Sequence, residues 1–291
     1  MRERIGPLRV VVTGASSGLG EALAREYARR CRQSGRDLVI GLVARRAAAL
    51  QSLAAELETG SHIPGRPAAV PGSAPGNAAT VRAVPMALDV RDREALAEAA
   101  ARFVDAQGAP DVVIANAGVS VGTLTGEPGD AAQFEEIVAT NLCAMQDTFA
   151  SFLPAMRAAN RGTLVGIASV AGFRGLPGAG AYSASKAGAI AYLESLRVEL
   201  HGSPIAVVTI APGYVRTPMT AGNPYRMPFL IDADAFARRA VDAIERRRRF
   251  VVIPWPMGIV GAALRLLPRP LYDTLFARAP RKPRRSAAVE S

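Results

Sequence analysis

Tyr182 and Lys186 are the side chains of this sequence whose types and spacing most directly suggest chemistry. They stand four residues apart, so a helix places them on one face. An ammonium group close to a phenol favours the phenolate and lowers the phenol pKa from about 10 toward neutral pH. This is what a general acid or base requires. Taken alone, the same spacing is also typical of a surface pair on an amphipathic helix.

Ser169 adds a third polar group to this pair. It ends the predicted strand Leu164–Ser169, thirteen residues before Tyr182. A hydroxyl group at the end of a buried strand could hold a substrate carbonyl oxygen. Together, the three side chains predict proton transfer to or from an oxygen atom.

A glycine-rich turn follows the first predicted strand and opens the first predicted helix. Such a turn brings backbone amides against a pyrophosphate, and the helix N-terminus adds its own attraction for anions. Its glycine spacing, GxxxGxG, differs from the dinucleotide fingerprint GxGxxG, and a tight strand-to-helix connection is the alternative interpretation. The candidate cofactor-binding residues here are Gly14, Ser16, Ser17, Gly18, Leu19 and Gly20.

Arg45 and Arg46 follow the second predicted strand, where the fingerprint has an acidic residue for the ribose 2′-hydroxyl of NAD. A guanidinium group can instead make a forked, charge-assisted contact with a 2′-phosphate. This favours NADP(H) as the cofactor. If the two arginines only begin a solvated helix, NAD(H) remains open.

Two further strand ends carry residues that suit a ligand site. Asp89 and Val90 close the third predicted strand, and Asn116, Ala117 and Gly118 follow the fourth. Open α/β sheets bind ligands at the carboxyl edge of their strands, and Asp89 could hold an adenine amino group there. A glycine at position 118 allows close backbone approach, although an ordinary turn glycine explains it almost as well.

The elements that must position these residues alternate along the chain. Short apolar runs predict buried parallel strands, and the segments between them have helical periodicity, which is typical of a doubly wound α/β sheet. We therefore predict a three-layer, Rossmann-like single domain. The predicted strands are Leu8–Thr13, Leu38–Ala44, Val81–Leu88, Val112–Asn116, Leu164–Ser169 and Ile205–Ala211. The predicted helices are Glu21–Arg32, Ala47–Glu58, Arg93–Gln107 and Ala181–Leu200.

The domain organisation follows from where the alternation of predicted strands and helices is interrupted. Residues 59–83 are rich in Pro, Gly and Ala, which predicts a flexible surface insertion. Residues 1–250 are predicted to form the catalytic domain, and residues 251–291 a C-terminal extension. The extension holds a mostly apolar stretch, Trp255–Leu267, that is too short to span a bilayer. It could pack over the substrate pocket, contact another subunit or lie at a membrane surface with its arginines on anionic lipid.

Composition limits the function classes. The chain has 291 residues, of which 49% are hydrophobic and 21% charged, and this excludes global disorder. The net charge of +10 comes largely from arginines at 246–249 and 265–285, which predict a solvated basic tail. No nucleic-acid motif accompanies them, so specific nucleic-acid binding is not expected. Two distant cysteines predict neither a disulfide nor a metal site, and with no apparent signal peptide they favour a cytoplasmic location.

Taken in order, these motifs resemble the classical short-chain dehydrogenase/reductase (SDR) family over roughly residues 8 to 220. The resemblance implies that Tyr182 is the general acid or base and that Ser169 orients and polarises the carbonyl. Lys186 would tune Tyr182 and bind the nicotinamide ribose, so Tyr182 and Lys186 also contact the cofactor. Asn141 would complete the catalytic set by holding a water that extends a proton path from Lys186; the alternative is an asparagine satisfied by backbone groups.

The resemblance extends to the segment after the sixth predicted strand. Pro212, Gly213, Val215 and Thr217 match family positions near the nicotinamide carboxamide, with Val215 and Thr217 the expected contacts. One departure is Ala115, which stands where the family often has the first asparagine of its NNAG motif. We expect this difference to affect local support more than chemistry.

The implied function is NADP(H)-dependent hydride transfer between a ketone or aldehyde and an alcohol, with reduction favoured. The apolar, glycine-rich segments near the motifs suggest a lipophilic or 3-oxoacyl-type small molecule as substrate. A homodimer or homotetramer is expected, with peripheral membrane contact through the C-terminal segment as an open alternative. A regulatory Rossmann protein that binds NADP(H) without turnover is the rival hypothesis, but such a protein would be expected to have lost Tyr182 or Lys186.

Overall fold

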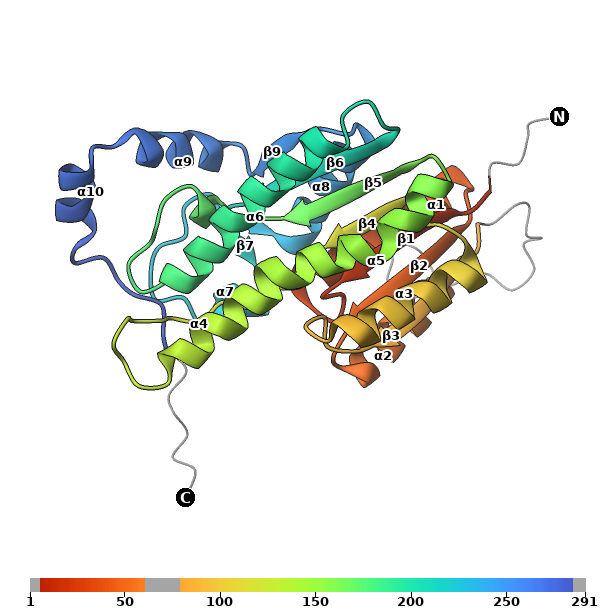
Figure 1. The fold of residues 1–291 in the computed structure, drawn as a ribbon, viewed down its shortest axis with the longest axis horizontal. Coiled ribbons are helices and arrows are strands. Elements are labelled where there is room, and N and C mark those ends of the chain that lie inside the picture. The colour runs from red at the N-terminus through yellow and green to blue at the C-terminus, as the bar shows by residue number, and fades with distance from the viewer. Residues whose placement is uncertain (1–5, 61–78, 285–291) are drawn as a thin grey trace, which may run out of the picture.

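The computed structural model describes residues 6–60 and 79–284 of the chain. Within these residues, seven parallel strands form the central sheet in the order β3-β2-β1-β4-β5-β6-β9 (Figure 1). The strand order reverses between β1 and β4, the kind of switch point at which open α/β sheets bind ligands. The strands are β1 (Leu8–Thr13), β2 (Leu38–Ala44), β3 (Val81–Ala87), β4 (Val112–Ala115), β5 (Gly162–Ile167), β6 (Ile205–Pro212) and β9 (Phe250–Ile253).

Helices cover both faces of this sheet, because its strands are apolar on both sides. Val10 and Val12 of β1 belong to one hydrophobic core, whereas Val11 belongs to the other. The first core lies under α1 (Gly18–Ser34), α2 (Ala47–Thr59) and α8 (Ala233–Glu245), and the second under α3 (Arg93–Gln107), α5 (Ala144–Ala158) and α6 (Gly180–Glu199). The predicted three-layer, doubly wound fold is confirmed.

Shorter elements connect and extend these layers. They are α4 (Asp130–Val138), a π-helical turn (Ala139–Cys143), a 3-10 turn (Val170–Gly172), β7 (Val215–Arg216), α7 (Pro218–Ala221), β8 (Ile231–Asp232), α9 (Pro256–Leu266) and α10 (Arg269–Phe276). The sequence did not predict α4, α5, α8 or β9. Strand β9 pairs with β6 through Ile253, so the sheet continues past residue 250, where the sequence placed the domain boundary.

The predicted flexible insertion, residues 59–83, needs a correction at its end. Its central part, residues 61–78, lies outside the described residues. Val81 begins β3, and Val81 to Ala83 pair with Leu38 to Ile40 of β2. These residues therefore belong to the sheet, because the neighbouring strand satisfies their backbone groups.

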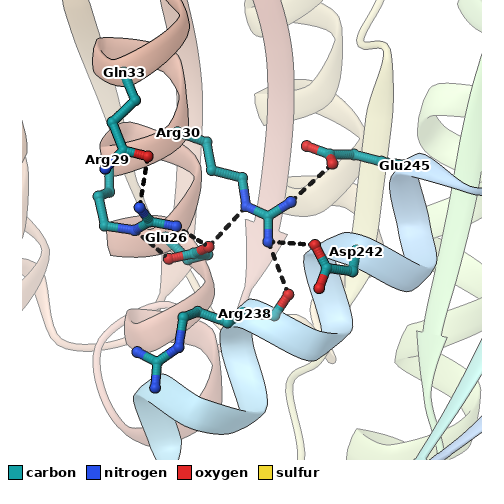
Figure 2. Close-up of polar contacts among 7 residues, drawn as sticks. All are labelled: Glu26, Arg29, Arg30, Gln33, Arg238, Asp242 and Glu245. Carbon is teal, nitrogen blue, oxygen red and sulfur yellow. Dashed lines mark hydrogen bonds and ion pairs between the residues drawn. The ribbon is translucent and has the colours of Figure 1, made fainter.

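An ion-pair network fixes α8 against α1 (Figure 2). The Arg30 guanidinium donates to Glu26 on its own helix at 2.7 Å and reaches Asp242 at 2.7 Å and Glu245 at 2.8 Å on α8. Arg29 also donates to Glu26, which is only 5% exposed. A carboxylate at this depth is stable only when such charged donors compensate for its lost water. The network therefore ties α8, which precedes β9, to α1, which follows the glycine-rich turn.

The C-terminal helices α9 and α10 lie beyond one end of the sheet, and the chain then returns toward α4 and α7 (Figure 1). Arg174, in the loop before α6, donates to the carbonyls of Leu264 and Leu267 at 3.1 and 3.0 Å, and the Tyr272 hydroxyl donates to the Gly175 carbonyl at 2.5 Å. The extension is thus built onto the loop that precedes Tyr182. None of the helices described is long and apolar enough to cross a bilayer.

We call residues 277–284 the C-terminal strap, because this segment runs from α10 to α4 and contacts the loops after β4 and before α6 (Figure 1). Arg284 pairs with Asp130 at 2.9 Å and with Glu127 at 3.0 Å. The Gly122 amide donates to the Pro283 carbonyl at 2.9 Å. A solvated basic tail was predicted here. Most residues of the strap are exposed, but acidic groups near α4 and backbone groups of a surface loop hold it in place.

Candidate active site

A cavity of about 330 Å³ opens at the carboxyl ends of the strands, around the switch point between β1 and β4. It gathers the predicted residues from seven separate segments of the chain. Those that line it are Gly14, Ser16, Ser17, Gly18, Leu19, Arg45, Arg46, Asp89, Val90, Asn116, Ala117, Gly118, Ser169, Tyr182, Lys186, Pro212, Gly213, Val215 and Thr217. Gly20 and Asn141 do not line the cavity; they contact residues that do.

The glycine-rich turn needs its glycines for different physical reasons. Gly14 and Gly18 have φ values of +69° and +61°, a region that side chains with a Cβ rarely adopt. Gly20 has an ordinary φ, but a Cβ there would overlap the Gly14 carbonyl and lie 2.7 Å from Asn116 Nδ2. Gly20 therefore allows the helix to approach the turn, and it does not line the cavity.

Asn116 and Thr13 hold this turn against β4. The Asn116 amide nitrogen Nδ2 donates to the Thr13 carbonyl at 2.9 Å. In return, the Thr13 hydroxyl accepts hydrogen bonds from the backbone amides of Asn116 and Ala117, each at 3.0 Å. Ala115, the departure from the family motif, is buried in β4, so Asn116 supplies the polar support.

The two arginines after β2 flank the cavity and leave much of their surface exposed. Arg46 Nη2 donates to the Ser16 hydroxyl at 3.1 Å and to the Ser16 carbonyl at 3.0 Å. Arg45 lies 4.0 Å from Asp89, with its side chain 60% exposed. Both guanidinium groups thus retain donors for an anionic ligand beside the glycine-rich turn.

Arg91 is a functional neighbour that sequence reasoning missed. It pairs with Asp89 at 2.7 Å, and this hydrogen bond is the main cause of the lowered pKa of Asp89. The Asp89 carboxylate is therefore paired closely with Arg91 and only at 4.0 Å with Arg45. The run Asp89-Val90-Arg91 carried the signal, since neighbouring acidic and basic residues at a strand end can pair locally.

Tyr182, Ser169 and Lys186 meet at the floor of the cavity. Ser169 caps the 3-10 turn by accepting a hydrogen bond from the Ala171 amide at 3.1 Å. Lys186 Nζ donates to the Ile167 carbonyl at 2.8 Å and lies 5.9 Å from the centre of the Tyr182 ring. The helical spacing of Tyr182 and Lys186 places both on the face of α6 that meets the end of β5.

The pKa values at this site differ from the sequence-based expectation. Burial raises the pKa of Tyr182, and a hydrogen bond with Ser169 acts only partly against it. The predicted lowering by Lys186 is not found, because burial dominates and the Lys186 ammonium donates to the Ile167 carbonyl instead. Burial also lowers the pKa of Lys186 to about 8. The phenol therefore remains protonated at neutral pH, in the form that can donate a proton.

Asn141 lies in the π-helical turn and is fully buried. Its Oδ1 accepts from the Val119 amide at 2.8 Å, while its Nδ2 donates to the Val119 carbonyl at 3.0 Å and to the Ser185 hydroxyl at 3.1 Å. It therefore links the loop after β4 to α6, the helix that carries Tyr182 and Lys186. In this structure its contacts are those of a positioning residue.

The segment after β6 closes the cavity on the side of the C-terminal extension. A Cβ at Gly18 would touch the side chain of Thr217 at 3.5 Å, so the glycine-rich turn and α7 face each other closely. Gly213 donates to the Ile253 carbonyl at 2.9 Å, and a Cβ there would lie 2.6 Å from Met257 Cγ in α9. Sequence reasoning missed Val119, Thr140 and Met219 among the lining residues, because isolated apolar and hydroxyl residues carry no spacing signal.

The family model for short chain dehydrogenase matches residues 9–226, about three quarters of the sequence. The chain belongs to the short-chain dehydrogenase family. The predicted family and oxidoreductase class are thereby confirmed. This dehydrogenase has its C-terminal helices and strap outside the matched range.

Proteins of similar sequence or structure are described as oxidoreductases, reductases or dehydrogenases. The dehydrogenase is 37% identical to an uncharacterized oxidoreductase of Myxococcus xanthus, covering 92% of this chain and 96% of that protein. It is 30% identical to a 3-oxoacyl-(acyl-carrier-protein) reductase of Thermotoga maritima, covering 74% and 76% of the two chains. Among solved structures, a short-chain dehydrogenase of Sphingobium yanoikuyae in complex with NADPH superposes with a TM-score of 0.68 at 27% identity, covering 88% and 93%.

Proposed function

We propose that this short-chain dehydrogenase is an NADP(H)-dependent carbonyl reductase acting on a lipophilic or 3-oxoacyl-type ketone or aldehyde. The observation that carries the proposal is the convergence of Ser169, Tyr182 and Lys186 beside a glycine-rich turn in one cavity. The Tyr182 phenol is protonated at neutral pH and can supply the proton that a new alkoxide needs in the reduction direction.

The glycine-rich turn and the two arginines support a nicotinamide dinucleotide phosphate as the cofactor. Gly14 and Gly18 line the cavity and hold the turn in a conformation with positive φ, so that its backbone amides and the start of α1 can bind a diphosphate. Arg45 and Arg46 suit a 2′-phosphate, and the similar Sphingobium yanoikuyae enzyme was solved with NADPH. When bound, the cofactor supplies the hydride that reduces the carbonyl carbon.

The side chains of the site then have separate roles. Ser169 and Tyr182 hold the substrate oxygen, and their hydroxyls stabilise the charge that develops on it. Tyr182 transfers its proton to that oxygen. Lys186 does not lower the pKa of the resting phenol, but its ammonium lies 5.9 Å from the centre of the Tyr182 ring, where it can compensate the negative charge of the phenolate left behind. Asn141 holds in place the loop and helix that carry these groups.

A panel of carbonyl substrates assayed with NADPH and NADH in parallel tests the function. The purified protein should oxidise NADPH in the presence of an aliphatic or 3-oxoacyl ketone, with stoichiometric formation of the alcohol. Heat-inactivated protein and the reaction without ketone are the controls. The proposal would be contradicted if NADPH were consumed without formation of the alcohol, or if no ketone or aldehyde of the panel were reduced with either cofactor.

The pH dependence of reduction should report on Lys186. Its pKa of about 8 means that the ammonium predominates below pH 8 and is lost as the pH rises through this value. We therefore expect kcat/KM to be nearly flat toward neutral pH and to fall above about pH 8. In Lys186→Arg, whose guanidinium stays charged, the fall should move to higher pH even if the maximal rate is lower. A wild-type profile that stays flat to pH 10 would argue against this assignment.

We also propose that the exposed apolar face of α9 and α10 rests on an anionic lipid surface. Buried Met257 and Gly261 face the protein, yet the opposite side of the helices is apolar as well. A helix that is apolar all round needs a second partner. The exposed side chains on this face are Trp255, Ile259, Leu266, Leu271 and Leu275, from 49% to 83% exposed. Exposed Arg265 and Arg269 provide charge complementary to acidic headgroups.

Sedimentation with vesicles tests this surface. Full-length protein should sediment with vesicles of phosphatidylcholine and phosphatidylglycerol, and less with phosphatidylcholine alone. Replacing Trp255, Ile259 and Leu266 by serine should abolish sedimentation while leaving the cofactor affinity unchanged. Equal partitioning of the two proteins would refute the lipid contact.

Light scattering on both proteins measures the predicted homodimer or homotetramer. Dissociation of only the serine variant would assign the face to a subunit interface.

A further inference from the structure

Lys282 is a basic residue of the C-terminal strap that reaches the rim of the active-site cavity. Its Nζ donates to the Ser120 hydroxyl at 2.8 Å and to the Met219 carbonyl at 3.4 Å. Met219 lines the cavity, as does Val119, which precedes Ser120. The strap therefore brings a cation to the edge of the site from a segment outside the family match.

The strap is held in this position by close packing. A Cβ at Gly122 would overlap the Lys282 carbonyl, and a Cβ at Gly178 would lie 2.8 Å from the Arg281 side chain. Gly122 lies in the loop after β4, and Gly178 lies in the loop before Tyr182. Both loops thus have room for the strap only because glycine stands at these positions. Together with the Arg284 ion pairs, this packing makes the placement of Lys282 specific.

Lys282 differs from Arg284 in its charge environment. Within the part of the chain that the structure describes, no carboxylate lies within ion-pair distance of Lys282, whereas Arg284 has two. Lys282 is partly buried, and this lowers the pKa of its ammonium group. An ammonium has three donors, and two are used. A partly desolvated cation with neutral partners and a remaining donor is suited to bind an anion.

We propose that Lys282 is a specificity-determining residue that binds an anionic group on the substrate, at a distance from the reacting carbonyl. The substrate class is then a carbonyl compound with an otherwise apolar body and a carboxylate or phosphate. The inference rests on the proposed reductase function, because it places the reacting carbonyl at Tyr182. It narrows that function from lipophilic ketones in general to anionic ones.

Matched ketones test this proposal with the NADPH-loaded protein. Methyl ketones with a terminal carboxylate, over a series of chain lengths, are compared with their methyl esters, and keto phosphates with the corresponding keto alcohols. In the wild type, kcat/KM should favour the anion at the best length. In Lys282→Met the ratio of anion to neutral analogue should fall at least about tenfold, mainly through KM. Lys282→Arg should restore much of the preference for the anion. The series with the larger anion-to-neutral ratio, carboxylate or phosphate, identifies the anionic group that Lys282 binds.

Arg281→Met is the matched control, because it removes one positive charge from the same segment without touching Ser120. Methionine also keeps the Cβ and Cγ atoms that pack against Gly178. The anion-to-neutral ratio should be unchanged in this variant. An equal loss in Arg281→Met and Lys282→Met would mean a general effect of charge and would overturn the proposal. So would an unchanged ratio in Lys282→Met.

Binding measured without turnover separates this inference from the proposed function. Isothermal titration of the NADPH-containing protein with unreactive alkyl carboxylates and alkyl phosphates should give a Kd for the wild type at least about tenfold lower than for Lys282→Met. If no ketone is reduced but this difference is found, the reductase function fails and the anion site remains. If ketones are reduced but the two proteins bind the anions equally, the Lys282 inference fails alone.

Discussion

Tyr182→Phe is expected to lower kcat/KM for carbonyl reduction by about 10³-fold, within the 10²–10⁴ range of general acid catalysis. The variant keeps the aromatic ring but loses the hydroxyl that donates the proton, and burial of that phenol raises its pKa and keeps it protonated. Since Lys186 still donates to the Ile167 carbonyl, NADPH affinity should change by only a few-fold. Steady-state rates and a fluorescence titration of NADPH measure the two effects.

Tyr192→Phe is the matched control for this variant. Tyr192 lies on the same helix, but its ring stacks on Phe149 in the core, and it does not line the cavity. Removal of its hydroxyl should leave kcat/KM within about twofold of the wild type. If Tyr182→Phe retained a near wild-type rate on a substrate that the wild type reduces, Tyr182 would not be the general acid.

Replacing Arg45 and Arg46 together by alanine is expected to reduce kcat/KM for NADPH by about 10²- to 10³-fold and to change kcat/KM for NADH little. Hydrogen bonds to charged groups contribute about 1.5–3 kcal/mol each, and about 1.4 kcal/mol corresponds to a factor of ten. Arg46 should account for the smaller share, since it already donates to Ser16. The ratio of kcat/KM values for the two cofactors measures the effect.

Arg102→Ala controls for the loss of positive charge in general. Arg102 is an exposed residue of α3 whose partner is Glu98 on the same helix. This variant should retain the cofactor ratio of the wild type. If the ratio is also unchanged in the Arg45, Arg46 double variant, the 2′-phosphate is not recognised at this position, and NAD(H) becomes an equal candidate.

Much of the fold could be predicted because it is recorded in local patterns. The strand β2 is a continuous apolar run, β1 is mostly apolar, and the helix Arg93–Gln107 was predicted with the bounds that the structure has. Helix α5 and strand β9 were missed. Pro154 lies inside α5 and interrupts its pattern, and β9 is a strand of four residues between a run of arginines and a proline. Such short or interrupted elements are stabilised by their neighbours more than by their own sequence.

The sequence by itself determined the Tyr182 and Lys186 pair, because helical spacing alone brings them to one face. It also determined the strand-end residues around the cavity, because the carboxyl ends of parallel strands meet at one edge of a sheet. The residues that line the cavity follow from these local rules.

Only the tertiary structure decided the protonation of Tyr182, since burial and not spacing controls its pKa. It alone showed that Asn141 ties Val119 to Ser185. It alone brought Lys282 to Ser120, across 162 positions of the sequence. Contacts of this kind depend on how separate elements pack, and a solvated basic tail and a strap at the rim of an active site have the same composition.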